Sequence, residues 1–312
     1  MKPASRQFVK PFRLPFVLLL LLLPGLFLGA QVPIRQADLN VHTQIAPAYF
    51  GPNAFPVPDA FPTHPSRELR AELAGDYYRG HLADGQDYTW DPLVYVEIPL
   101  WSKRVSMAFW GPIREWYSMS EAVAEARRVP EGGAGTGNDT GDLYVATYVN
   151  LLEEKGCLPE ATFRAVLKTA AGDDYGRARH YDAPGYYFDL LLSKSYTFPS
   201  GSFFRTLQAG LDVGFLYWQT DNGRQNDAHL YGIMGQVDTR AARLTAQWGG
   251  YCGWEADGDS PAVVKLRLDI HASPHLEPFF YFQQGLKDWP FTHFRLGLCY
   301  SLDLWSLRKP AG

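Results

Sequence analysis

Apolar and polar residues alternate without interruption between Val264 and Ala272, where the polar positions are Lys265, Arg267, Asp269 and His271. Successive side chains of a strand point to opposite faces, so this run predicts a strand with one apolar and one strongly polar face. The same period recurs in about twelve segments: Glu68–Tyr77, Val94–Leu100, Val105–Phe109, Leu143–Leu151, Thr162–Lys168, Phe188–Ser193, Thr206–Tyr217, His229–Val237, Arg243–Trp248, Val264–Ala272, Glu277–Gln283 and His293–Asp303. Only the facing of 229–237 is ambiguous, because apolar residues occupy both of its faces.

The connections between these segments alternate in length. Short ones lie at Trp101–Arg104, Glu153–Pro159, Phe198–Ser202, Thr239–Arg240 and Ser273–His275. Longer, more polar ones lie at His81–Trp90, Ser118–Gly141, Ala170–Gly185, Gln219–Asn226, Glu255–Pro261 and Leu286–Pro290. Short periplasmic turns alternating with long external loops are typical of a membrane barrel. We therefore predict an all-β fold, an antiparallel up-and-down transmembrane β-barrel of about twelve strands over residues 67–305, with a C-terminal tail at 306–312.

The first 66 residues lack this period. Four basic residues precede an apolar run from Leu14 to Gly29, which predicts a signal peptide over residues 1–30. Residues 31–66 contain seven prolines among several aromatic residues. We expect a Pro-rich periplasmic N-terminal arm that packs on the barrel mouth or enters the lumen, with a flexible tail as the alternative. In the loop 118–141, Ser120–Arg128 predicts a short helix with Ser120 as its cap.

Charge and cysteine content narrow the function classes. The formal net charge is −4, and it becomes −8 once the four basic residues of the leader are removed. Nucleic-acid binding requires a basic face, so it is not expected. Three cysteines at Cys157, Cys252 and Cys299 predict unpaired thiols, with Cys252 and Cys299 on opposite faces. The charged loop 170–185 shows no recognised metal-ligand spacing, and we expect no metal and no cofactor.

Several stretches resemble Gram-negative outer-membrane β-barrels, more narrowly those of the Bacteroidetes type. They are Tyr49–Pro58, Gly141–Val145, Asp182–Asp189 and Gln283–Pro290. The Gly-Asp-Leu start of one strand and the Leu167–Asp173 end of another are also similar to barrels associated with phenol degradation, distant kin of fatty-acid channels. The resemblance implies a fold and an outer-membrane location. It supplies no functional residues.

The best candidates for function are the charged side chains on the inward faces. They are expected to line the lumen, either as a pore lining or as a structural network of ion pairs. The set comprises Arg70, Glu72, Glu97, Arg164, Lys168, Asp189, Asp212, Arg243, Lys265, Arg267, Asp269, His271, Arg295 and Asp303.

One enzymatic alternative rests on His271 and Ser273, with Glu277 as a possible third member. The His-x-Ser spacing resembles that of outer-membrane lipid-A deacylases, which implies a lipid-A or phospholipid hydrolase. A serine hydrolase needs a base beside the hydroxyl and an acid that orients the base. By parity His271 faces the lumen and not lipid, and Pro274 follows Ser273 where those enzymes carry Asn. We therefore expect no enzyme and no catalytic residue.

The leading hypothesis is a passive or selective channel for small molecules, including amphipathic ones. The alternatives are the hydrolase and a non-conducting structural or adhesive barrel. Expected partners are outer-membrane lipids, lipopolysaccharide, a small-molecule solute and the barrel-insertion machinery. Whether the lumen is open or plugged by residues 31–66 does not follow from the pattern.

Overall fold

The computed structural model describes residues 48, 50–60, 68–100, 102–127, 129, 135–171, 184–219, 225–253 and 258–304. The expected leader, most of the loop 170–185 and the expected C-terminal tail lie outside these residues. Among the described residues no helix is long and apolar enough to cross a membrane.

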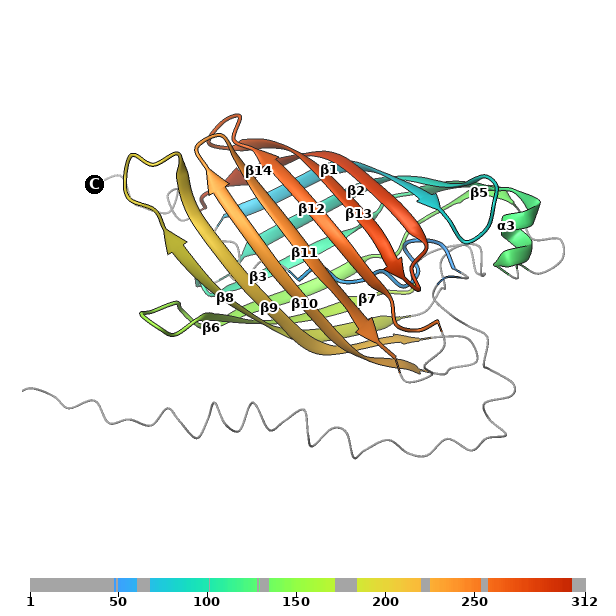
Figure 1. The fold of residues 1–312 in the computed structure, drawn as a ribbon, viewed down its shortest axis with the longest axis horizontal. Helices are drawn as coiled ribbons and strands as arrows, with labels where there is room; N and C mark the ends of the chain where they lie inside the picture. The colour runs from blue at the N-terminus through green and yellow to red at the C-terminus, as the bar shows by residue number, and fades with distance from the viewer. Residues whose placement is uncertain are drawn as a thin grey trace, which may run out of the picture. The chain divides into compact units, whose positions relative to one another are not determined.

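Twelve strands of the described chain close into one antiparallel barrel (Figure 1), as the alternation predicts. Each strand pairs with the next one along the barrel, and β1 pairs with both β2 and β14, which closes the cylinder. The twelve are β1 (Leu69–Gly80), β2 (Asp87–Pro99), β3 (Val105–Pro112), β6 (Tyr144–Leu152), β7 (Glu160–Lys168), β8 (Gly185–Thr197), β9 (Phe204–Gln219), β10 (Gln225–Thr239), β11 (Ala242–Cys252), β12 (Ala262–Ile270), β13 (Leu276–Lys287) and β14 (Phe291–Leu302).

Tight connections lie at one end of the barrel, which we call the turn end, and longer ones lie at the opposite loop end. Gly156 and Gly201 adopt φ angles of 58° and 97° in two turns, a region that glycine enters without steric cost. One expected long loop is wrong: β13 and β14 are joined by residues 288–290 alone, because β13 continues to Lys287, which pairs with Ala262 of β12.

The connection between β3 and β6 contains further structure. β4 (Glu115–Met119) pairs with the first residues of β2, and β5 (Thr136–Asp139) pairs with β4. The helix α3 (Glu121–Ala126) lies between them, close to its predicted position. Ser120 occupies the N-cap position of this helix, as predicted, although its side chain makes no capping hydrogen bond.

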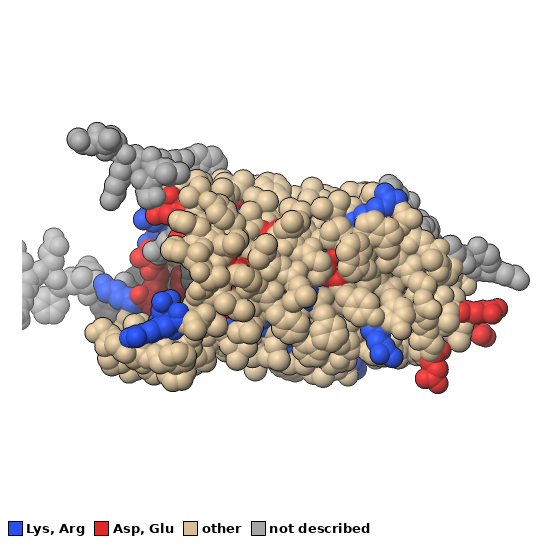
Figure 2. Space-filling view, turned by 90° about the horizontal axis from the view of Figure 1, so that it is seen from above, with Lys and Arg blue, Asp and Glu red and all other residues tan. Residues whose placement is uncertain are grey.

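Apolar side chains face outward along the wall. Leu73 and Leu296, on neighbouring strands near mid-height, are 61% and 66% exposed. In Figure 2 few Lys, Arg, Asp or Glu side chains occupy the middle of the visible face, and most gather toward its two ends. Soluble monomers rarely expose a continuous apolar belt, whereas a lipid-embedded barrel needs one. Of the three free thiols, Cys157 and Cys252 are exposed and Cys299 is buried, as predicted.

Candidate functional site in the lumen

Residues 50–60, which we call the lumen segment, lie inside the barrel. Phe50, Ala54, Phe55 and Val57 are almost fully buried and belong to one cluster with inward side chains of the barrel wall. The rings of Phe50 and Phe55 meet edge to face, with centroids 4.9 Å apart. The described part of the N-terminal arm therefore enters the lumen and fills part of it.

The lumen segment runs from the loop end toward the middle of the barrel. Near its start, Asn53 donates a hydrogen bond to Asp91 Oδ2 over 3.1 Å and accepts one from Tyr78 Oη over 3.0 Å. Asn53 also donates to Glu115 on β4. At the far end of the segment, Ala60 lies against Gly232 in the middle of β10, where any β-carbon would meet the Ala60 methyl.

Lys265 on β12 holds the middle of the segment. Its Nζ donates to the carbonyl oxygens of Val57 and Pro58, over 2.8 and 3.0 Å, and also contacts the Asp59 carboxylate. The Lys265 side chain is only 4% exposed. An ammonium is stable at such burial only when its donors are satisfied, and the segment provides all three acceptors.

Buried ion clusters join the strands inside the barrel, and the first of them connects β1 and β12, which are distant in sequence. Arg267 donates to Glu72 Oε1 over 2.8 Å and to Asp269 Oδ1 over 2.9 Å, and its guanidinium lies 4.0 Å from the Phe279 ring centroid. Arg70 contacts the same Glu72 carboxylate. These side chains are 17% exposed or less, so the cluster stabilises the charges of four residues in the interior.

The second cluster joins β7, β8 and β9. Arg164 Nε donates to both carboxylate oxygens of Asp189, over 2.9 and 3.1 Å, and Arg164 Nη2 lies 3.6 Å from Asp212 Oδ2. The guanidinium also covers the Tyr187 ring at 5.1 Å. One cation here faces two buried carboxylates, so Arg164 is the residue on which the cluster depends.

A third cluster lies toward the loop end and includes two residues absent from the predicted set. Asp76 accepts from Arg295 Nη2 over 2.9 Å and contacts His293 Nε2 at 3.0 Å. The His293 ring stacks on Tyr78 with centroids 4.0 Å apart. Asp76 and His293 share the inward parity of Arg70 and Arg295, so the alternation alone contained the signal for both.

Buried ion pairs also lie at the loop end. Arg127, which follows α3, pairs with Asp87 over 2.6 Å and lies over the Phe291 ring at 5.0 Å. Lys168 at the end of β7 pairs with Asp142 over 2.6 Å. Arg127 was not among the predicted residues because loop residues carry no period that indicates their facing.

At the turn end, His271 does not form a hydrolase site. Its Nε2 lies 2.8 Å from Asp238 Oδ1 and its Nδ1 contacts Glu277, so carboxylates occupy both ring nitrogens. Ser273 Oγ instead accepts from the backbone amides of His275 and Leu276 within the turn. No ring nitrogen is left to take a proton from Ser273, so the arrangement that a serine nucleophile requires is not assembled.

The other predicted lumen residues differ in how deeply they are buried. Glu97 is buried near the turn end and accepts from Tyr95 Oη over 2.9 Å. Arg243 lies nearer the rim, with 27% of its side chain exposed. Asp303 is exposed and lies one residue beyond the end of β14, so the strand pairing does not fix its facing and its inward position stays a prediction. That the inward residues line a conduction path stays a prediction.

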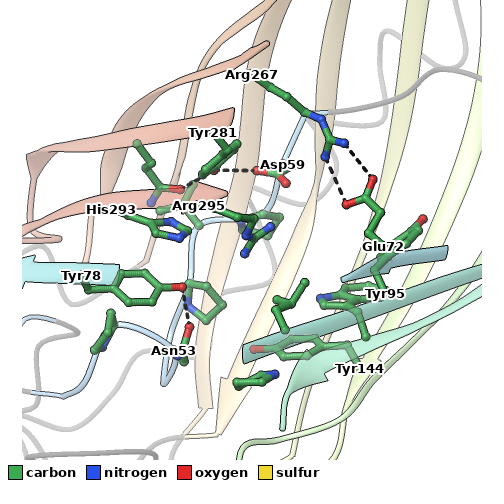
Figure 3. Close-up of a pocket in the computed structure, with 18 of the residues that line it drawn as sticks. Asn53, Asp59, Glu72, Tyr78, Tyr95, Tyr144, Arg267, Tyr281, His293 and Arg295 are labelled. Carbon is green, nitrogen blue, oxygen red and sulfur yellow. Dashed lines mark hydrogen bonds and ion pairs between the residues drawn. The ribbon is translucent and has the colours of Figure 1, made fainter. Parts of the chain in front are cut away.

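A cavity of about 180 Å³ lies between the lumen segment and the wall. In Figure 3, Tyr78, His293 and Tyr281 lie toward one side of this space, and Tyr95 and Tyr144 lie toward the other. Asn53 and Asp59 of the lumen segment also line it. Four guanidinium groups do so as well, from Arg70, Arg164, Arg267 and Arg295. Among the described residues, no group of three or more His, Cys, Asp or Glu side chains is placed to hold a metal ion.

Comparisons with known proteins support the fold. No family model matches the chain, and no curated protein does. Among solved structures, the chain is similar to the COG4313 outer membrane channel from Pseudomonas putida F1, with 12% identity, a TM-score of 0.52, and coverage of 80% of this chain and 97% of that one. It also aligns with a KdgM porin in complex with disordered oligogalacturonate, with 7% identity, a TM-score of 0.45, and coverage of 75% and 99%. At these identities the likeness concerns the fold alone, and the narrower resemblance to Bacteroidetes-type and phenol-associated barrels stays a prediction.

Proposed function

We propose that this protein is an outer-membrane channel for small molecules and that its lumen segment acts as the gate. The apolar outer wall suits a lipid bilayer, and the inward faces carry charged residues over the height of the barrel. The observation that carries the proposal is the attachment of the segment. Lys265 holds it through hydrogen bonds that water can replace, and no covalent link among the described cysteines retains it.

A non-conducting structural barrel is the second candidate, and one observation favours it. Phe50, Phe55 and Val57 pack into the apolar cluster of the lumen, as a permanent core would. Moving them out would expose buried apolar surface, at a cost of roughly 1.5–3 kcal/mol for each fully buried side chain. A gate would therefore open rarely unless a solute or a partner stabilises the open form.

Planar-bilayer conductance separates the two candidates. We compare the wild-type protein with Lys265→Met, which loosens the segment, and with a variant that locks it. The lock is an Ala60→Cys, Gly232→Cys pair in a background without the native cysteines. A β-carbon at position 232 would lie 2.6 Å from that of residue 60, whereas a disulfide places the two β-carbons about 3.8 Å apart, so the bond requires the segment to move away from β10 by about 1 Å.

A channel gives larger or more frequent current steps for Lys265→Met than for the wild type, and smaller ones for the oxidised lock, which recover on reduction. Absence of current in all three proteins, each shown to be folded and inserted, would refute the channel and leave the structural barrel. Under this proposal lipopolysaccharide and outer-membrane lipids contact the outer wall, and the barrel-insertion machinery places the protein in the membrane.

A further inference from the structure

We propose that the lumen segment closes the barrel together with one proton, which the carboxyl group of Asp212 holds in the closed form. The inference rests on the proposed gate, because it concerns how often the segment leaves the lumen. Three observations carry it. They are the balance of charges around the end of the segment, the burial of Asp212, and the position of Asp212 beside the segment.

The charges around the end of the lumen segment do not balance. Three cations act on Asp59, and each of them already contacts a carboxylate. The pairs are Lys265 with Asp59, Arg164 with Asp189, and Arg295 with Asp76. The neighbouring cluster of Arg70 and Arg267 with Glu72 and Asp269 is balanced in itself. Asp212 is therefore one carboxyl group more than these cations neutralise.

The surroundings of the Asp212 carboxyl do little to stabilise a negative charge. The residue is 1% exposed, and Arg164, its one ion-pair partner among the described residues, lies 3.6 Å away. Arg164 already donates to both oxygens of Asp189 through Nε. Asp212 Oδ1 has no hydrogen-bond partner among the described residues. Two buried carboxylates beside one guanidinium repel each other, and a proton on one of them removes the repulsion.

The same two carboxyl groups contact each other directly. The side chains of Asp189 and Asp212 are hydrogen-bond partners. An ionised carboxylate only accepts hydrogen bonds, so a hydrogen bond between two carboxyl groups requires a proton on one of them. Asp189 has the guanidinium of Arg164, so the proton belongs on Asp212.

Asp212 also lies beside the end of the lumen segment. A β-carbon on Gly232 would lie 2.6 Å from that of Ala60 and 3.5 Å from that of Asp212, so the segment and Asp212 are neighbours. Lys265, which contacts Asp59, also acts electrostatically on Asp212. When the segment leaves, Asp59 leaves with it. Lys265 then faces Asp212 without a competing carboxylate, and Asp212 releases its proton to the water that enters the lumen.

The sign of the pH dependence follows from the groups around Asp212. They are Asp189 and Tyr187 on β8, Arg164 on β7, Lys265 on β12 and Asp59 of the lumen segment. Of these, the segment removes only Asp59 when it leaves. The closed form therefore binds one proton more than the open form, and a fall in pH favours closure. For one proton, the ratio of closed to open form changes by at most about tenfold per pH unit.

Hydrogen exchange of the amides in residues 50–60 tests this in the full chain in lipid vesicles. Protection is taken relative to the intrinsic rate at each pH, between about pH 5 and pH 8. We expect the wild-type protection to fall as the pH rises, by up to about tenfold per unit. Asp212→Asn has nearly the same shape and is neutral without a proton. Its protection should therefore stay at the low-pH level of the wild type throughout the range.

Asp59→Asn approaches the same balance from the other side. It leaves the lysine of the wall available to Asp212 in the closed form, so closure no longer takes up a proton. Protection should then be independent of pH, but lower than that of the wild type at low pH. Asp84→Asn, at an exposed residue of the β1–β2 connection, is the control and should keep the wild-type dependence.

A wild-type protection that does not change with pH would overturn the proposal. So would a pH dependence that persists in Asp212→Asn or in Asp59→Asn, because the proton would then be bound elsewhere. His293, which contacts Asp76 near the start of the segment, is the next group to replace in that case.

The exchange measurement does not require that the barrel conducts. A barrel that shows this pH dependence but never conducts would keep the proton on Asp212 and refute the channel. A barrel that conducts, with exchange independent of pH, would keep the channel and refute the proton.

Discussion

Lys265 Nζ contacts the Asp59 carboxylate across 206 residues of sequence and donates to two carbonyl groups of the same segment. This one side chain therefore joins the barrel wall to the segment that fills the lumen. Lys265 was predicted to face the lumen, but its partners belong to an irregular segment with no period of its own.

Replacing this lysine tests how firmly the segment is held. Lys265→Met keeps the length of the side chain and removes its donors, so we expect the hold to weaken by roughly 1.5–3 kcal/mol. Hydrogen exchange of the backbone amides in residues 50–60 should become faster. Lys194→Met, at a lysine near the turn end that donates to the Gly156 carbonyl, should leave that exchange unchanged. Slow exchange in both variants would show that apolar packing alone retains the segment.

Gly232 tests the packing at the far end of the lumen segment, where Ala60 lies against β10. A valine there would bring its β-carbon to about the 2.6 Å approach that an ideal β-carbon makes to the Ala60 methyl, so the segment must move. We expect Gly232→Val to lower the unfolding temperature and to raise the conductance. Gly235→Val, on the same strand at a site with open space, is the matched control and should change neither. Equal behaviour of the two variants would mean that the packing at Ala60 is not tight.

The cluster around Arg164 should dominate the stability of its strands. Arg164→Met leaves Asp189 and Asp212 buried without their cation, which typically costs about 3–5 kcal/mol. Urea unfolding in lipid vesicles measures the loss. Arg243→Met near the rim, where the arginine lies 3.7 Å from Glu277 and is partly exposed, should cost less than about 1 kcal/mol. A similar loss in the free energy of unfolding at the two positions would mean that burial does not decide the contribution of these ion pairs.

The outer wall has a test of its own. Leu296→Arg places a charge near mid-height on the outward face and should destabilise the inserted barrel by about 2–4 kcal/mol. Leu158→Arg in the turn between β6 and β7 should cost about 0–1 kcal/mol, because charges near the interface stay hydrated. Unfolding of both variants from vesicles decides the point. An equal cost would mean that Leu296 does not face the hydrocarbon core.

Acid should loosen one turn. The hydrogen bond from Lys194, aided by the amide of Ser195, holds the pKa of the Glu154 carboxyl below its ordinary value. A group with a lowered pKa contributes its stabilisation above the ordinary value and loses it as the pH falls through the folded-state pKa. The protection of the Ser195 amide against hydrogen exchange, taken relative to its intrinsic rate at each pH, should therefore fall below about pH 4. Glu154→Gln should abolish that pH dependence, and a persistent dependence would point to another group.

The alternation by itself determined the barrel. Its period of two predicted the twelve strands and, for all but 229–237, their inward and outward faces, because lipid and lumen select opposite residue types at every second position. For the same reason most of the charged residues now seen in the lumen could be identified, from Arg70 to Arg295. The pattern was silent on their partners, since Arg267 and Glu72 meet only after the sheet closes between β14 and β1.

Only the tertiary structure decided what occupies the lumen. The facing of 229–237 was ambiguous because its inward residues are apolar, and the fold explains this: Ala228 and Leu230 share a cluster with Phe50, Phe55 and Val57 of the lumen segment. A period-two pattern distinguishes two faces only when one of them is polar. Here a segment about 170 residues earlier in the chain supplies an apolar neighbour to the inner face. The difference in polarity between the two faces of 229–237 is therefore lost, and the local sequence does not identify the segment that packs against it.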